Sequence, residues 1–372
     1  MRAEARTRVL VVGADAAAEG WGARAHIPAV LAHPALELEA ICTSRAETAE
    51  NAAARWGARR WFADFEEAVA TPDVDLVTVA VRVGLHSPIV RAAAEAGKPV
   101  YCEWPLGLSA AEASELAAAA DAVPTAVGLQ GRFSPAVRYA RELLDSRAFG
   151  RPLTFTAMQT LARFPVPSGR QWLAHEHEGS GALNVATGHT LDIVEYLLGP
   201  TDGIAGASAT LAPADVFSDT CESFSWTAAD TVAVTASVVG GAIGTVYVTY
   251  LADPPGGFVL DVFCEEGRVS LRAPGYVSYT PCVLRVGRRK GTLRTAVVPR
   301  RLRDGVLDVE PSANVARALA AFADASHARS HFRPNFYDAA RLHGVLEAIR
   351  RSELTPLGGC GEHTPRPPAE VL

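Results

Sequence analysis

A histidine and an aspartate lie three residues apart in the segment from Thr187 to Gly199, which has the apolar spacing of an amphipathic helix that ends at a glycine. Side chains three residues apart share a helix face, so His189 and Asp192 can touch. An imidazole beside a carboxylate keeps a raised pKa and can pass a proton to or from a substrate oxygen. The pair is therefore a candidate for acid–base catalysis. The spacing alone leaves open a buried histidine with only a structural role.

Two further histidines, His175 and His177, have the H-x-H spacing of a metal site. No third ligand accompanies them in the sequence, so we expect loop residues and no metal.

A glycine-containing loop follows the first predicted strand and leads into the first helix. It contains Gly13, Gly20, Trp21 and Gly22. The dinucleotide fingerprint G-x-G-x-x-G takes this position in a βαβ unit, because its glycines let the backbone approach a pyrophosphate at the helix N-terminus. Here the spacing is stretched and the middle is rich in alanine. The position favours dinucleotide binding, and the alternative is an ordinary glycine-containing turn.

The second predicted strand, Leu36–Cys42, leads into Thr43, Ser44 and Arg45, about twenty residues after the loop. A site for NAD has an Asp or Glu there to accept a hydrogen bond from the ribose 2′-hydroxyl, whereas a hydroxyl and a guanidinium suit a 2′-phosphate. We therefore expect NADP, with NAD possible. The alternative is that Ser44 and Glu47 form a capping box and Arg45 is merely solvated.

The segment Ala96–Leu106 predicts a helix stop at Gly97, a short buried strand, and then Glu103-Trp104-Pro105. In open α/β sheets, ligands bind beyond the carboxyl ends of the strands, so Glu103 and Trp104 stand where chemistry is expected. Trp104 is unusually bulky for that position.

Strands and helices alternate over the first 130 residues. The predicted strands are Arg8–Gly13, Leu36–Cys42, Asp75–Val81, Pro99–Cys102 and Thr125–Leu129. The predicted helices are Arg45–Trp56, Ser87–Ala96 and one through Ala120 that Ser109 and Glu112 would cap. Such alternation implies parallel strands joined by right-handed crossovers, and hence a doubly wound Rossmann sheet.

The pattern changes after helices at Ser134–Ser146 and Thr187–Leu198. Residues 203 to 309 form successive predicted strands, with hairpin signals at Gly240-Gly241 and Glu265-Glu266-Gly267. We therefore expect an α/β protein with an NAD(P)-binding Rossmann domain at 1–131 and a C-terminal α/β domain at 132–353. The second domain would carry a large, mostly antiparallel open sheet, and a flexible tail would follow at 354–372.

Composition excludes several classes of protein. A chain of 372 residues with a net charge of −6 gives no support for nucleic-acid or membrane-surface binding. No apolar run approaches the roughly 20 residues that span a bilayer, and the N-terminus lacks the apolar stretch of a signal peptide. Six scattered cysteines without a C-x-x-C pair indicate reduced thiols and a cytoplasmic protein. A basic run between Arg285 and Arg303 is interpreted as a charged sheet edge, rather than a nucleic-acid site.

In combination, several motifs resemble the glucose–fructose oxidoreductase / inositol dehydrogenase / rhizopine-catabolism (Gfo/Idh/MocA) family. They are the loop with His26-Ile27-Pro28, the Ala96–Leu106 segment, Gly128–Pro135, His189 with Asp192, and the final helix from Phe336. The resemblance covers nearly the whole chain. It implies a Rossmann domain, a second domain whose open sheet makes homodimers or homotetramers, and NAD(P)-dependent redox chemistry on sugars, cyclitols and related small molecules.

Three departures from the family pattern place the chain nearer one subgroup. The family's dehydrogenases have a catalytic lysine where this chain has Trp104, and an aspartate where it has Val185; the glycine loop with Gly20-Trp21 also differs. These features resemble the subgroup of the fungal galactose-pathway co-repressor, an NAD(P)-binding regulator. Trp104 cannot donate a catalytic proton.

Two functions follow as expectations. The first is an NADP-dependent oxidoreductase that transfers a hydride to or from a carbonyl or hydroxyl group of a sugar-like or secondary metabolite. His189 would move the proton, Asp192 would orient it, Trp104 would shape the substrate site, and His86 or a tyrosine is an alternative proton donor. The second is a non-catalytic NAD(P)-binding regulator. The expected cofactor-binding residues are Gly13, Gly20, Trp21, Gly22, Ser44, Arg45, Val81, Arg82, His86, Glu103, Trp104 and Gln130.

Overall fold

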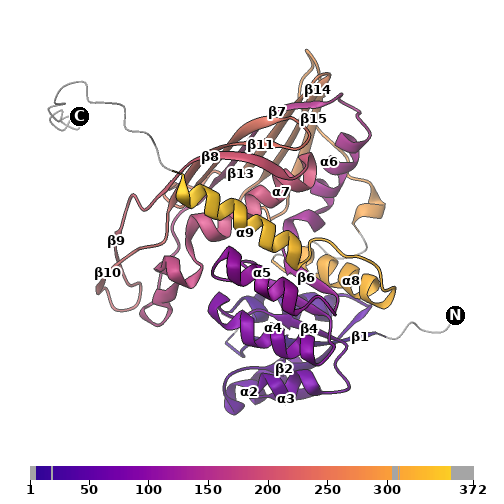
Figure 1. Ribbon diagram of the computed structural model, residues 1–372, viewed down its shortest axis with the longest axis vertical. Helices are drawn as coiled ribbons and strands as arrows, with labels where there is room; N and C mark the ends of the chain where they lie inside the picture. The colour runs from indigo at the N-terminus through magenta and orange to yellow at the C-terminus, as the bar shows by residue number, and fades with distance from the viewer. Residues whose placement is uncertain (1–5, 18–19, 304–308, 310, 353–372) are drawn as a thin grey trace.

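The structure is a computed structural model that describes residues 6–17, 20–303, 309 and 311–352. Two large β-sheets form its framework, a parallel one in the N-terminal part and a mixed one in the C-terminal part (Figure 1). The predicted fold class, a doubly wound parallel sheet followed by a mostly antiparallel open sheet, is confirmed. The tail expected at 354–372 lies outside the described residues.

The first sheet has six parallel strands in the order β3-β2-β1-β4-β5-β6. All five predicted strands form, with ends within two residues of the prediction, and only the short β3 was not predicted. The strands are β1 Thr7–Val12, β2 Leu36–Cys42, β3 Arg60–Phe62, β4 Leu76–Val79, β5 Val100–Glu103 and β6 Thr125–Gly128. Strands such as β4 are apolar and buried throughout, as parallel strands covered by helices must be.

Helices cover both faces of this sheet. They are α1 Ile27–Ala32, α2 Ala46–Trp56, α3 Phe65–Ala70, α4 His86–Glu95 and α5 Ala110–Ala119. Helices α3, α4 and α5 share one hydrophobic core with the sheet, and α1 shares the other. Ser109 caps α5 as predicted, because its hydroxyl accepts the backbone N–H of Glu112; the Glu112 carboxylate accepts instead from Leu108.

The second sheet has eight strands in the order β16-β15-β14-β13-β7-β12-β11-β8. All pairs are antiparallel except β7 with β12. The strands are β7 Pro152–Thr160, β8 Thr201–Ala209, β11 Thr231–Val238, β12 Ile243–Thr249, β13 Gly257–Cys264, β14 Gly267–Ala273, β15 Val283–Arg288 and β16 Arg294–Thr295, and β9 Ala214–Val216 pairs separately with β10 Ser223–Ser225. Both hairpin signals lie at observed hairpins, whereas β7, in the middle of the sheet, was not predicted.

Helices α6, α7 and α9 lie over one face of this sheet (Figure 1). The C-terminal helices also return to the first sheet: α9 packs beside α5, and α8 joins the core that α1 shares with β1 and β2. The helices are α6 Pro135–Asp145, α7 Gly188–Leu198, α8 Ala313–His327 and α9 Phe336–Arg351. The end of the chain thus ties the two sheets together.

The other face of the second sheet carries no helix in Figure 1. Residues alternate between buried and exposed along β11 and β12, and Met158, Ile243 and Tyr247 are exposed apolar side chains. The basic run begins on β15 and β16, at the edge of the sheet, as the interpretation of a charged edge requires. None of the helices in the described residues is long and apolar enough to cross a membrane.

Candidate active site

Gly13 ends β1 in a conformation that a larger residue would not tolerate. Its φ is +100°, and an added Cβ would lie 2.6 Å from the carbonyl oxygen of Ala80. At the other end of the loop, a Cβ on Gly22 would lie 2.6 Å from the carbonyl oxygen of Gly13. The loop therefore folds back tightly on the end of β1, which is the close backbone approach that a bound pyrophosphate requires. Gly22 opens a π-helical turn, Gly22–His26, that runs into α1.

A pocket of about 410 Å³ opens beside Gly13, at the carboxyl ends of β1, β2 and β4. Of the predicted cofactor-binding residues, Gly13, Ser44, Arg45 and Val81 line it. Apolar walls come from Phe65 and other side chains, and Asp15, Thr43 and Thr48 add polar groups. We call this the nucleotide pocket. Its mixture of apolar walls and a few polar groups fits the nucleoside part of a dinucleotide.

The capping role considered for Ser44 is wrong. The N-cap residue of α2 is Arg45, and no side chain caps the helix. The turn is held instead by Thr43, whose hydroxyl lies 2.6 Å from the hydroxyl of Thr48 and donates to the carbonyl oxygen of Arg45. Ser44 and Arg45 are exposed at the pocket wall. Their hydroxyl and guanidinium groups are therefore placed to meet a ligand.

Glu103, at the end of β5, is the centre of a buried polar network. Nε2 of His26 lies 2.7 Å from Oε1 of Glu103, and the Gln130 amide donates to both carboxylate oxygens at 2.8 and 2.7 Å. Gly128 leaves the space that the carboxylate fills, since a Cβ there would lie 2.5 Å from Oε2. The network joins three predicted elements: the glycine loop, β5 and β6. The sequence indicated His26 only as part of the motif His26-Ile27-Pro28, and not as a partner of Glu103.

Trp104 fills the boundary between the first sheet and the C-terminal helices. Its indole N–H donates to the carbonyl oxygen of Asn184 at 2.9 Å, and its ring lies 4.6 Å from that of His343. Gly188 packs directly against the indole: a Cβ there would lie 2.4 Å from Nε1. Trp104 is only 6% exposed. The position that resembles the family's lysine therefore holds a packed side chain whose single donor is already bonded.

His86 and Arg82 follow β4 without lining the nucleotide pocket. The ring nitrogens of His86 lie 3.2 Å from the carbonyl oxygen of Leu106 and 3.1 Å from that of Val81, and burial lowers its pKa. The neutral ring carries one N–H, which can donate to only one of these two carbonyl oxygens. His86 is thus held by backbone beside the β4 and β5 loops, which does not favour it as the proton donor. Arg82 is partly exposed at the start of the turn Val83–Leu85.

The expected pairing of His189 with Asp192 is not what the structure contains. Arg132 binds the Asp192 carboxylate through Nε and Nη2, with distances of 2.6 to 3.0 Å. Burial raises the pKa of Asp192 to about 6 against the attraction of Arg132. Burial also lowers the pKa of His189 to about 4, and the charge that opposes this shift is that of Glu103. The raised pKa expected for His189 is therefore wrong, because desolvation outweighs a carboxylate that is not adjacent.

A cluster of aromatic side chains outside the sequence motifs adjoins His189 through Tyr276. The Tyr276 ring meets the His189 ring edge-on, with 6.5 Å between centroids, and its hydroxyl is hydrogen-bonded to that of Tyr250. Tyr279 stacks on Tyr276 at 5.6 Å and lies 5.5 Å from Trp21 of the glycine loop. Burial raises the pKa of both Tyr250 and Tyr276. We call His189, Tyr250, Tyr276 and Trp104 the catalytic seam.

Two family models match the chain. One is described as an oxidoreductase family with an NAD-binding Rossmann fold and matches residues 7–129; the other is a Gfo/Idh/MocA C-terminal domain and matches residues 137–270.

Curated relatives include both enzymes and a regulator. The chain is 35% identical to the dehydrogenase aclE of Aspergillus oryzae over 189 residues, 50% of this chain and 52% of that protein. It is 32% identical to the levoglucosan dehydrogenase of Pseudarthrobacter phenanthrenivorans over 186 residues, 48% and 47% of the two. It is 27% identical to the galactose/lactose metabolism regulatory protein GAL80 of Saccharomyces cerevisiae over 220 residues, 51% and 47%. The chain thus matches about half the length of each of these relatives.

The fold itself is shared over almost the full length with solved structures. A levoglucosan dehydrogenase in complex with NADH and L-sorbose superposes with a TM-score of 0.79 at 23% identity, covering 93% of this chain and 96% of that one.

Proposed function

The chain belongs to the Gfo/Idh/MocA oxidoreductase family, and on this basis we propose that it is an NADP-dependent oxidoreductase. It would transfer a hydride to or from a carbonyl or hydroxyl group of a small, sugar-like or secondary-metabolite substrate. The observation that carries the proposal is the nucleotide pocket, in which Ser44 and Arg45 stand beside the tight Gly13 turn.

Residues of the first sheet would hold the cofactor. The turn at Gly13 and Gly22 brings backbone close enough for a pyrophosphate, and Val81 supplies an apolar wall. Arg45 and Ser44 would bind a ribose 2′-phosphate by charge-assisted hydrogen bonds. When bound, NADP accepts or supplies the hydride. The family is described as NAD-binding, so the proposed preference for NADP over NAD rests on Ser44 and Arg45.

His189 would move the proton. With a pKa of about 4 it is neutral at physiological pH, so it can accept a proton from a substrate hydroxyl as that hydroxyl is oxidised. In the reductive direction the protonated His189 would return the same proton to the substrate oxygen. The hydrogen-bonded hydroxyls of Tyr276 and Tyr250 keep their protons because their pKa values are raised, and they are the alternative donors. Asp192 would act only through its ion pair with Arg132, which anchors α7.

The relatives support the substrate class. Dehydrogenases of levoglucosan and D-apiose, both carbohydrates, are among them, at 32% and 28% identity over about half of this chain. We therefore expect polyhydroxylated substrates with a secondary hydroxyl or a carbonyl group.

Titration with NADPH and with NADH, followed by tryptophan fluorescence, tests the cofactor assignment. We expect NADPH to bind more tightly, and Arg45→Gln to weaken NADPH by about tenfold, because one hydrogen bond to a charged group contributes about 1.5 kcal/mol or more. NADH affinity should be unchanged in that variant. Arg294→Gln, an exposed arginine on β16 far from the pocket, is the control. Equal binding of both cofactors that is insensitive to Arg45→Gln would contradict NADP selectivity, and binding of neither would remove the proposal.

The second candidate is a nucleotide-binding regulator without catalysis. It is favoured by Trp104, whose buried indole offers no group for proton transfer, and by the similarity to GAL80. A pull-down from the native host with and without NADP distinguishes the two. A partner recovered only in one cofactor state, together with no turnover of any carbohydrate tested, supports the regulator; turnover contradicts it.

The open face of the second sheet is the surface we propose for a homodimer or homotetramer, because Met158, Ile243 and Tyr247 expose apolar area there. Sedimentation of the purified chain would show a dimer or tetramer, and a monomer at micromolar concentration would contradict this. The five described cysteines are free thiols, which supports a reducing, cytoplasmic location.

A further inference from the structure

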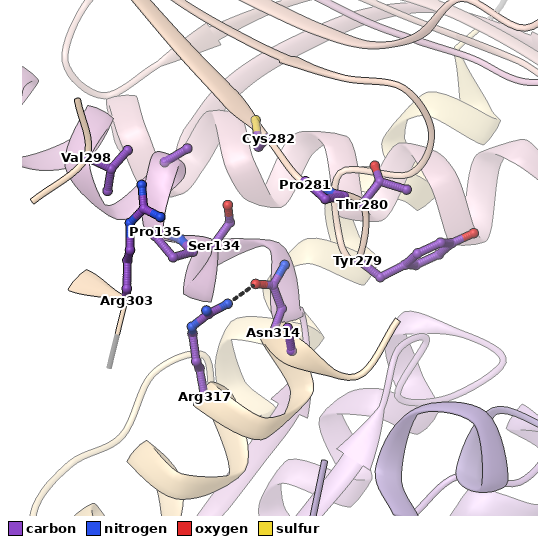
Figure 2. A pocket seen from close by; sticks show the side chains of 12 residues that line it. Ser134, Pro135, Tyr279, Thr280, Pro281, Cys282, Val298, Arg303, Asn314 and Arg317 are labelled. Atoms are coloured by element: carbon purple, nitrogen blue, oxygen red, sulfur yellow. Dashed lines mark hydrogen bonds between the residues drawn. The ribbon is translucent and has the colours of Figure 1, made fainter. Parts of the chain in front are cut away.

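A second pocket, of about 110 Å³, lies where the N-termini of α6 and α8 meet the loop after β14 (Figure 2). Ser134 and Pro135 come from α6, Asn314 and Arg317 from α8, and Tyr279 from the loop. Its volume is about a quarter of the 410 Å³ of the nucleotide pocket. It can therefore enclose one small group, and not a nucleotide.

Ser134 presents an unused hydroxyl to this pocket. It is the N-cap residue of α6 and only 3% exposed, yet its side chain makes no capping hydrogen bond. Within the described residues its hydroxyl has no other hydrogen-bond partner. In Figure 2 the hydroxyl points into the space between Arg303, Pro281 and Asn314. A buried N-cap hydroxyl that does not cap its own helix is normally hydrogen-bonded to another polar group. The position of this hydroxyl in the pocket points to a ligand as that group.

The surroundings favour an anion. Arg303 and Arg317 line the pocket, and none of its twelve lining residues, all within the described ranges, carries a carboxylate. The Arg303 guanidinium forms no ion pair or hydrogen bond with any residue in those ranges. Neither α6 nor α8 has a side-chain cap, and both helix N-termini, the positive ends of their dipoles, line this pocket. Pro135 begins α6 without an N–H, and the N–H of Ala313 is bonded to the carbonyl oxygen of Val309, so the helices contribute positive potential.

We propose that this pocket binds the oxyanion group, phosphate or carboxylate, of a small ligand. The Ser134 hydroxyl and the Arg303 guanidinium donate to the oxyanion, while Arg317 and the two helix ends add positive potential. The site does not depend on hydride transfer. It does adjoin the catalytic seam, because Tyr279 lines it and also stacks on Tyr276 and lies against Trp21. A bound ligand would therefore contact the Tyr279 ring, which lies between Trp21 of the glycine loop and Tyr276.

Calorimetric titration of the full chain with inorganic phosphate, and separately with acetate, tests the site at constant ionic strength. We expect one of the two to bind, and Arg303→Gln and Ser134→Ala each to weaken that binding at least about tenfold. Ser134→Ala should fold normally, since the hydroxyl does not cap α6. Arg301→Gln is the matched control, because Arg301 lies two residues away, pairs with Glu142 and does not line the pocket.

Phosphate can also enter the nucleotide pocket, so Arg45→Gln is titrated in parallel. Binding that is lost in Arg303→Gln and Ser134→Ala but kept in Arg45→Gln and Arg301→Gln supports the proposal, and the preferred probe identifies the group. Binding lost only in Arg45→Gln overturns it. Absence of binding by either anion at millimolar concentrations also overturns it.

Discussion

The nucleotide pocket is lined from loops that follow three neighbouring strands of one sheet, whereas the catalytic seam draws on four separate segments. His189 comes from α7, Tyr250 from the end of β12, Tyr276 from the loop after β14, and Trp104 from the end of β5. The polar groups of the pocket, Ser44 and Arg45, are exposed, while His189, Tyr250 and Trp104 of the seam are buried and Tyr276 is partly buried.

Because of this difference, substitutions in the pocket and in the seam should change different properties of the protein. An exposed side chain in the pocket has few neighbours within the protein, so its replacement should change ligand binding and leave the fold intact. In the seam, burial shifts the pKa values of His189, Tyr250 and Tyr276, and the Trp104 indole is held by its hydrogen bond to Asn184. Substitutions there should therefore affect turnover and folding more than cofactor affinity.

The largest expected effect is on turnover. His189→Ala should lower kcat by roughly 10²–10⁴, the range expected for the loss of a general acid–base group, and leave the NADPH dissociation constant unchanged. His189→Gln, which keeps most of the volume, should lose as much activity without the cavity. The measurement is steady-state oxidation of an identified carbohydrate alongside fluorescence titration.

Normal turnover in both variants would remove His189 from the mechanism and leave Tyr276 as the proton-transfer group. An equal loss of turnover and of cofactor affinity would show that the seam and the pocket are not separate.

The same contrast explains which parts of the molecule could be predicted from sequence. Four predicted residues line the pocket: Gly13, Ser44, Arg45 and Val81. Each follows a strand that an apolar run in the sequence predicts. They are close together because the carboxyl ends of parallel strands meet at one edge of the sheet. The strand β7 was not predicted, because its partners β12 and β13 lie far later in the chain: Thr154 pairs with Ile243, and Thr160 pairs with Gly257.

The contacts around His189 and Asp192 could not be predicted from spacing. His189 and Asp192 do share a helix, but Arg132, sixty residues earlier, binds the carboxylate. Tyr276 and Tyr250 carry no local motif, and only the pairing of distant strands brings them to His189. Spacing along one helix shows what can touch, and the tertiary structure decides what does.

The next effect in size is on stability. Arg132→Met leaves the Asp192 carboxylate buried at 1% exposure without its partner, so the free energy of unfolding should fall by about 3–5 kcal/mol. Arg351→Met is the control: it breaks an exposed pair with Glu347 and should cost about 0–1 kcal/mol. Urea unfolding at neutral pH measures both. Similar small losses in the two variants would mean that Asp192 finds water or another donor, and that the surroundings of α7 are less closed than the burial of Asp192 implies.

The smallest expected effect is an absence of pH dependence where an ordinary histidine would show one. A solvated imidazole gains its proton near pH 6.5, but burial holds the pKa of His189 at about 4 even with the Glu103 charge nearby. If neutral His189 is the base, kcat/KM for oxidation should stay level as pH falls through about 6.5 and decline only toward pH 4. Tyr250 and Tyr276, with raised pKa values, contribute nothing in this range. Burial raises the pKa of Asp192 to about 6, so the profile is also recorded for Asp192→Asn. A fall with a midpoint near 6.5 that persists in Asp192→Asn would show that His189 is reached by water in the working enzyme, and the seam would then resemble the exposed pocket more than its structure indicates.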